Sequence, residues 1–270
     1  MMRVTPVILL SLMARVSIAQ PHVTAWNVLV DGFNDKKLER RQQAITAIGS
    51  VGPTSETAKL LEQALRDDDP IIRQTTAAVL GQMKFRQSIP VLKAALDDES
   101  GEVAFTAAKA LWDMGDRSGK DIIEEVLGGE RKDTAGLVDT AKRDARAKLH
   151  NPKSLALMGV KEASGALLGP FSIGIYAAEQ AFKDSGAAGR ILSTTLLTQD
   201  CDARAQQVLE SSLAGDKNWA VKAASARAIG QCGNADAIPK LEQHLSDSRD
   251  AVKFMAAASI VRLSATPGQK

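Results

Sequence analysis

Residues 216–233, DKNWAVKAASARAIGQCG, are the stretch on which the fold of this 270-residue chain depends. Small and apolar residues recur there at helical spacing, with an acid before them and a glycine after them. The pattern returns in residues 246–263, SDSRDAVKFMAAASIVRL, where Asp247 follows Asp216 by thirty-one residues. It stands earlier in residues 67–83, DDDPIIRQTTAAVLGQM. A repeat of this length that holds two short helices is typical of a helical solenoid.

The repeats keep one phase through seven units. We number the second, inner helix of each unit from a reference position that is basic in six units. A small residue follows three positions later and a large aliphatic residue seven positions later, within about 40° of each other on a helix. The pattern therefore predicts an all-α, right-handed superhelix of about seven helix pairs, with no β-sheet. The reference residues are Arg41, Arg73, Ala104, Lys142, Arg190, Lys222 and Lys253.

An acidic column precedes the reference positions by six residues. An aspartate there can accept backbone N–H groups at the start of the helix, and it can pair with the base of its own or the next unit. We expect a ladder of ion pairs that is broken near the middle, where Ala104 replaces the base and Gly136 the acid. The expected ladder consists of Asp35, Arg41, Asp67, Arg73, Asp184, Arg190, Asp216, Lys222, Asp247 and Lys253.

Residues 221–245, VKAASARAIGQCGNADAIPKLEQHL, and their copies resemble the HEAT family. They are most similar to the short HEAT-like repeats of phycobilisome lyases, and the resemblance extends over roughly residues 26–263. It implies that the charged ladder is structural and that the chain is an exported bacterial HEAT-repeat protein.

The first nineteen residues predict a secretory signal peptide. Arg3 is followed by an apolar run that ends in the small-x-small site at residues 17–19. The alternative is a buried first helix. We expect an exported protein, periplasmic or extracellular, with a solenoid over residues 20–263 and a flexible tail over 264–270.

Two segments interrupt the period. Residues 128–134 are polar and glycine-rich, as in a longer surface loop, and residues 151–168 predict an inserted apolar helix. The insertion either caps a shift in the superhelix or forms a groove for a partner. It does not predict a membrane span, because Lys161 and Glu162 lie inside it.

Charge and composition limit the function classes. The formal net charge is +2, and removal of residues 1–19 with Arg3 and Arg15 leaves a balanced chain, which disfavours nucleic-acid binding. The three histidines at 22, 150 and 244 lack metal-ligand spacing, and no phosphate loop or nucleophile motif is present. We therefore expect no metal and no cofactor. The sequence leaves the oligomeric state open.

Two functions compete. The first is a non-catalytic scaffold that binds a protein or peptide along its inner face. The second is an enzyme or enzyme accessory, lyase-like or glycosylase-like, with a cleft near the irregular middle. Trp112, Asp113 and Trp219 could imitate the aromatic and acidic groups of a glycosylase cleft, although Trp112 is also expected to fill the seam between helices.

Certain inner-helix residues lie between the packed face and the polar face. Apolar groups there are either a partner surface or buried by the curvature of the superhelix. The candidates for binding are Phe105, Lys109, Arg143, Ile191, Trp219, Arg227, Phe254 and Met255.

The two cysteines, Cys201 and Cys232, lie one repeat apart, each in the turn that leaves an inner helix. Export would permit a disulfide between them. Packed helices place equivalent points about 8–10 Å apart, whereas bridged Cα atoms lie within about 7 Å. A disulfide therefore requires the two turns to lean together; otherwise both are buried thiols.

Overall fold

The computed structural model describes residues 21–129, 184 and 186–265. Within these ranges every regular element is helical and no strand occurs, as the repeat pattern predicts. The predicted signal peptide (1–19), the inserted helix (151–168) and Arg143 lie outside the described residues, and so does nearly all of the predicted tail.

A first helical segment covers residues 21–33. The remaining α-helices are α2 (Leu38–Val51), α3 (Ser55–Ala64), α4 (Pro70–Met83), α5 (Ile89–Ala94), α6 (Gly101–Asp113), α7 (Lys120–Gly128), α11 (Ala187–Leu197), α12 (Ala203–Gly215), α13 (Trp219–Cys232), α14 (Ile238–Glu242) and α15 (Asp250–Ser264), with short 3₁₀ turns at Arg86–Ser88, Ala95–Asp97 and Ala235–Ala237.

The inner helices are α2, α4, α6, α11, α13 and α15. Each begins three residues before its reference position, so the sequence phase and the helix starts agree. Local caps set several of these starts. The carboxylate of Asp69 accepts the N–H of Ile71, and the side-chain oxygen of Asn218 accepts the N–H of Ala220, each at 2.9 Å. Such caps satisfy backbone donors that the helix itself leaves unpaired.

The seam between neighbouring inner helices is built from the small and aliphatic columns. Ile48, Leu80, Leu111, Ile229 and Ile260 are fully buried. Small residues let the backbones approach closely. A Cβ on Gly81 would lie 2.7 Å from Cβ of Ala110, and one on Gly230 would lie 2.4 Å from Oγ of Ser259. In the small column, Ser193 on α11 is exposed because α11 ends the row among the described helices, whereas the other described members are fully buried: Ala44, Thr76, Ala107, Ser225 and Ala256.

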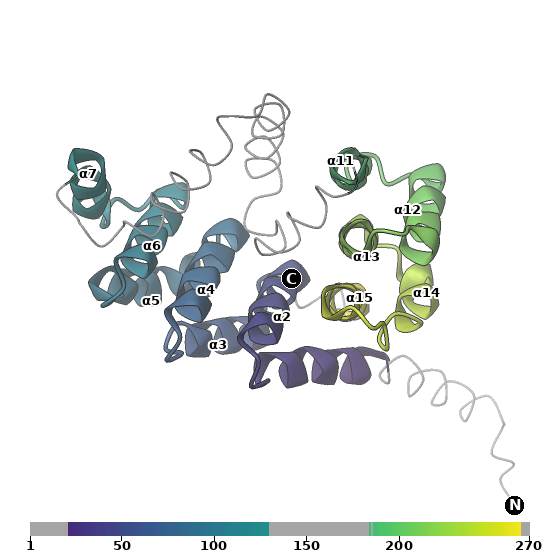
Figure 1. Cartoon of the computed structure of the whole chain (residues 1–270), viewed down its shortest axis with the longest axis horizontal. Helices are drawn as coiled ribbons and strands as arrows, with labels where there is room; N and C mark the ends of the chain where they lie inside the picture. Colours follow the sequence, from purple (N-terminus) through teal and green to yellow (C-terminus); the bar gives the residue numbers. More distant parts are fainter. Residues whose placement is uncertain (1–20, 130–183, 185, 266–270) are drawn as a thin grey trace, which may run out of the picture.

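The order of the inner helices in space differs from their order in the chain. Figure 1 shows α15, the last helix, beside α2, while α7 and α11 lie toward the two ends of the row. The inner row therefore runs α11, α13, α15, α2, α4, α6. The last unit of the chain stacks on the first and joins the two halves into one solenoid.

Three contacts fix this junction. The ring of Phe254 lies against Gly32, whose absent side chain makes room for it. Arg262 Nη1 donates to the carbonyl oxygens of Ser50 at 3.3 Å and Val51 at 3.4 Å, which caps the end of α2 from a helix more than two hundred residues away. Arg40 Nε lies 3.1 Å from Asp250 Oδ2.

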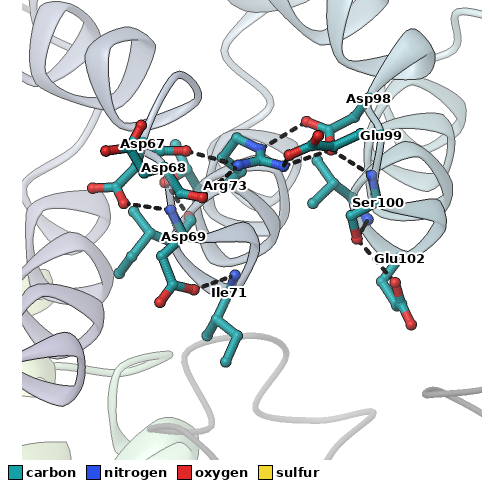
Figure 2. Close-up of polar contacts among 12 residues, drawn as sticks. Asp67, Asp68, Asp69, Ile71, Arg73, Asp98, Glu99, Ser100 and Glu102 are labelled. Atoms are coloured by element: carbon teal, nitrogen blue, oxygen red, sulfur yellow. Dashed lines mark hydrogen bonds and ion pairs between the residues drawn. The ribbon is translucent and has the colours of Figure 1, made fainter.

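The charged ladder is most complete at Arg73 (Figure 2). Its guanidinium binds both carboxylate oxygens of Asp98, in the next unit, at 2.8 and 2.9 Å, and donates to the carbonyl oxygens of Asp67 and Asp68. Asp98 also accepts the N–H of Ser100 at 2.8 Å. Burial alone would raise the pKa of Asp98, but the hydrogen bonds from Arg73 and Ser100 and the charge of Arg73 together lower it.

The same geometry recurs at two other arginines. Arg41 Nη2 lies 3.1 Å from Asp67 Oδ1, and Arg190 Nε lies 2.8 Å from Asp216 Oδ2. Arg190 also binds Asp184 in its own turn at 2.6 Å. Each arginine thus connects its own turn to the aspartate of the next unit.

The lysine positions behave differently. Lys222 forms no ion pair with any residue that the structure describes, and Lys253 pairs with Asp250 on its own helix at 3.0 Å. Asp247 binds the N–H of Arg249 at 2.8 Å instead of a base from the preceding unit. The expectation that these lysines continue the ladder is therefore wrong. A lysine ammonium is a single point of charge, whereas the forked guanidinium reaches two partners at once.

Cys201 and Cys232 form a disulfide with a Cα–Cα distance of 5.4 Å. The bond joins the turn after α11 to the last residue of α13. Cys201 adopts a left-handed conformation at φ 49°, and Gly233 adopts one at φ 80°. These two turns bring the ends of neighbouring helices closer than packed helices otherwise approach.

Candidate functional site: a cleft where the chain ends meet

A cleft of about 500 Å³ lies across the start of α15, between the starts of α13 and α2. One wall comes from the first unit, through Lys37, Glu39, Arg40 and Gln43, and the other from the last two units. We call it the junction cleft. It exists because the last unit packs on the first. The residues contributed by the last two units are Lys217, Asn218, Trp219, Ser248, Arg249, Asp250 and Ala251.

Trp219 is the aromatic residue of the cleft. It begins α13, is half-buried, and packs against both the main core and the small cluster between α11 and α13. The side chain thus has an anchored part and an accessible part. A tryptophan in this position offers a rigid apolar surface at low entropic cost to a ligand.

The charges of the cleft are unevenly compensated. Asp250 is held by Arg40 at 3.1 Å and by Lys253 at 3.0 Å. Arg40 in turn binds Asp35 at 2.5 Å and lies 6.0 Å from the ring centroid of Phe254. Asp250 is therefore neutralised by fixed partners.

Three other cations face solvent at the cleft. Lys37, Lys217 and Arg249 are exposed, and none of them forms an ion pair with a residue in the described part of the chain. Glu39 is also exposed and accepts a hydrogen bond from Gln43 at 3.2 Å. The surface of the cleft is net positive.

Two of these cations occupy helix N-cap positions. Lys37 precedes α2 and Arg249 precedes α15, and neither provides a side-chain cap. The equivalent positions before α4, α6 and α13 hold Asp69, Ser100 and Asn218, which all cap their helices. The two helices that meet at the junction thus begin with a base, whereas α4, α6 and α13 begin with a capping group and α11 begins with the uncapped Gly186.

The structure separates the residues predicted to bind a partner. Phe254 is 1% exposed, Met255 and Ile191 are also buried, and so the prediction that these three face a partner is wrong. Phe254 and Met255 are covered because α15 packs on α2, where Ser50 Oγ lies 3.7 Å from Met255 Sδ.

The remaining candidates are partly accessible but dispersed. Phe105 and Trp219 are half-buried, and Lys109 is exposed and pairs with Asp113 at 2.6 Å. Arg227 Nη2 donates to Thr195 Oγ1 at 3.5 Å, and burial lowers the pKa of its guanidinium. Of the seven candidates that the structure describes, Trp219 alone lines the junction cleft.

The glycosylase-like arrangement does not form. Trp112 is 40% exposed instead of filling a seam, and the guanidinium of Arg117 lies 3.8 Å above its ring. It does not share the junction cleft with Trp219. Among the described residues no group of three or more His, Cys, Asp or Glu side chains could hold a metal ion. No helix in the same residues is long and apolar enough to cross a bilayer.

Sequence reasoning missed Lys37, Arg40, Lys217 and Arg249. The available signal was the column four residues before the reference position, which holds bases at 37 and 249, capping residues at 69, 100 and 218, and a glycine at 186. That column shows that bases replace capping residues at 37 and 249. It does not show that the two bases line one cleft, because nothing in the chain order places residue 37 beside residue 249.

The family model for HEAT repeats matches residues 57–136 and 177–261, which is more than half of the chain. The protein belongs to the HEAT-repeat family. No curated protein matches this HEAT chain. Among solved structures, human deoxyhypusine hydroxylase in complex with glycerol is similar at 18% identity and a TM-score of 0.33, over 94% of this chain and 99% of that one.

Proposed function

We propose that this HEAT protein is an exported, non-catalytic scaffold that binds a protein or peptide partner, and that the junction cleft is its principal contact site. HEAT solenoids stack helix pairs into extended surfaces suited to this role. We also propose that its repeats are of the short HEAT-like type that occurs in phycobilisome lyases.

The observation that carries the proposal is the half-buried side chain of Trp219 in a cleft of about 500 Å³ that also holds three cations with no ion pair among the described residues. Interfaces between proteins favour an aromatic anchor surrounded by polar groups. Clefts of this size also suit the side chains of a few residues. Of the two carboxylates in the lining, Asp250 is held by Arg40 and Lys253, and Glu39 is exposed and bound to Gln43, which suits binding better than acid–base chemistry.

The disulfide supports export. A bond between Cys201 and Cys232 persists in an oxidising compartment and is rare in the reducing cytosol. Secretion of the full chain, with recovery of a protein that begins at Gln20, would test this part of the proposal. Retention of residues 1–19 in the cell-associated protein would contradict it.

A random peptide library displayed on phage tests the binding role. We expect selection on the disulfide-bonded chain from Gln20 to enrich a family of related peptides. In a Trp26→Phe, Trp112→Phe protein, Trp219 is the remaining tryptophan of the sequence, and a synthetic member of that family should shift its fluorescence saturably. Failure to enrich any peptide family would overturn the scaffold role.

A further inference from the structure

We propose that the junction cleft recognises an acidic segment of its partner, with an apolar side chain of that segment packed on Trp219. This inference rests on the binding role above and specifies the chemistry of the partner. It follows from the arrangement of charge at the junction.

The cations of the cleft outnumber its acids. Lys37, Arg40, Lys217 and Arg249 oppose Glu39 and Asp250 in the lining. The Asp250 charge is already balanced by Arg40 and Lys253. The exposed cations at 37, 217 and 249 therefore remain available to carboxylates that enter from solvent.

The position of two of these cations adds to the attraction. A helix carries partial positive charge at its N-terminus, so a base there is unfavourable and an acid favourable. Lys37 and Arg249 also forgo the capping bond that Asp69, Ser100 and Asn218 supply elsewhere. At positions 37 and 249 the residue is therefore not one that stabilises the start of its helix. At both positions it adds positive charge to the cleft instead. Local departures of this kind are typical of functional sites.

A peptide fits this surface better than a nucleic acid. Phosphate-backbone binding requires an extended basic row, whereas the cations here surround one small cleft in a chain with a formal net charge of +2. Trp219 adds an apolar contact in the same cleft. An acidic segment that carries an apolar residue would complement both features.

The test uses the displayed peptide library on three forms of the disulfide-bonded chain. The first is wild type. The second is Lys37→Glu with Arg249→Glu, which reverses the charge of the cleft. The third is the matched control Lys59→Glu with Arg204→Glu, which makes the same change at two exposed positions on α3 and α12 that do not line the cleft. Neither of these control side chains forms an ion pair with a described residue.

We expect peptides selected on wild type to be rich in Asp and Glu and to contain an apolar residue. Binding of a synthetic member should weaken about fivefold or more in the cleft variant, stay unchanged in the control, and fall as salt is added. The cleft variant should melt no lower than wild type, because it places acids at two helix starts. Loss of binding then cannot be attributed to unfolding.

Other outcomes overturn the inference in distinguishable ways. Enrichment of neutral or basic peptides, or equal binding to the cleft variant, would refute the acidic partner and leave the scaffold role intact. Displacement of the selected peptide by a DNA oligonucleotide of equal charge at the same concentration would show a general polyanion surface instead. If no peptide is enriched on any of the three forms, the scaffold role fails and this inference fails with it.

Discussion

Gly32 lies directly against the ring of Phe254. A Cβ on Gly32 would stand 2.4 Å from Cζ and 2.5 Å from Cε1 of that ring, and 3.0 Å from Cβ of Ala44. Gly32 belongs to the first helical segment and Phe254 to α15, so this contact joins the beginning of the solenoid to its end. A side chain at position 32 would force α15 away from the first unit.

Replacement of Gly32 by alanine should therefore lower the free energy of unfolding by about 1–3 kcal/mol, the usual cost of overpacking a core. The loss is expected although alanine favours a helix by up to about 1 kcal/mol over glycine. Urea unfolding monitored by circular dichroism measures it.

Gly189 on α11 provides the matched control. It is helical and exposed, and no atom lies within 4 Å of the position of its missing Cβ. Gly189→Ala should raise the free energy of unfolding by up to about 1 kcal/mol. Equal effects from the two substitutions would show that the close contact at Phe254 does not govern the result.

The sequence predicted the helices well because local periodicity encodes them. Six inner helices begin three residues before their reference positions, and the aliphatic column at Ile48, Leu80, Leu111, Ile229 and Ile260 is fully buried. Each of these features depends on residues within one unit. The disulfide was predictable for a related reason, since equivalent positions in adjacent units lie at the same edge of the stack.

The junction could not be predicted in this way. Every unit presents the same combination of small and aliphatic residues, so the pattern does not say which unit packs on which. The pattern therefore leaves open whether Phe254 and Met255 face a partner or are buried, and in the structure α2 covers them. The cleft itself was missed because it requires Lys37 and Arg249 to be neighbours, which only the long-range contact achieves.

The stacking order predicts that the chain can be cut without falling apart. A protease site inserted between residues 150 and 151 would separate the units before it from those after it, yet α2 and α15 hold the two groups together. After cleavage of the folded protein the two fragments should co-elute in size-exclusion chromatography. In a Gly32→Ala background the junction is weaker. The cleaved fragments should therefore separate on dilution at protein concentrations where the wild-type fragments still co-elute. Immediate separation of the wild-type fragments would refute the proposed strength of the junction.

Arginines at the same ladder position should differ in their effect on stability. The side chain of Arg73 is 8% exposed and that of its partner Asp98 is 10% exposed, whereas that of Arg190 is 41% exposed. Arg73→Met leaves a buried carboxylate without its cation and should cost about 3–5 kcal/mol. Arg190→Met removes a guanidinium that is 41% exposed, although its partner Asp216 is 12% exposed, and should cost less than Arg73→Met. Chemical unfolding of both variants checks this, and similar costs would mean that burial does not set the strength of the ladder.

The Arg73–Asp98 pair should make stability depend on pH in the acid range. Burial is the largest single influence on the pKa of Asp98 and raises it. The hydrogen bonds from Arg73 and Ser100 and the charge of Arg73 together outweigh burial, so the folded pKa is lowered. A carboxylate of this kind contributes fully above the ordinary Asp pKa of about 4, and the contribution is lost as the pH falls through the lower folded pKa. Wild type should therefore lose its advantage over Asp98→Asn as the pH drops below about 4. Urea unfolding over a pH series measures the difference.

Asp97 is the control for that series. It is the exposed neighbour of Asp98, so Asp97→Asn should leave the acid dependence of wild type unchanged. A parallel change in both variants would assign the effect to overall charge instead of the pair with Arg73.

The disulfide between Cys201 and Cys232 closes a sequence separation of 31 residues at the edge of α11 and α13. In the chain-entropy model, loss of such a loop constraint costs about 3–4 kcal/mol. We expect reduction, or the Cys201→Ser, Cys232→Ser variant, to lower the free energy of unfolding by about that amount.

The effect of reduction on local stability should differ between helices. α11 packs on α13 through Ile191 and Ala187 in a small cluster, whereas α2 and α4 belong to the main core. Amide hydrogen exchange should therefore accelerate in α11 upon reduction and stay slow in α4. Equal acceleration in both helices would show that the bond stabilises the whole protein by restricting the unfolded chain, with no local effect on α11. Unchanged exchange in α11 would show that the packing of this helix does not depend on the disulfide.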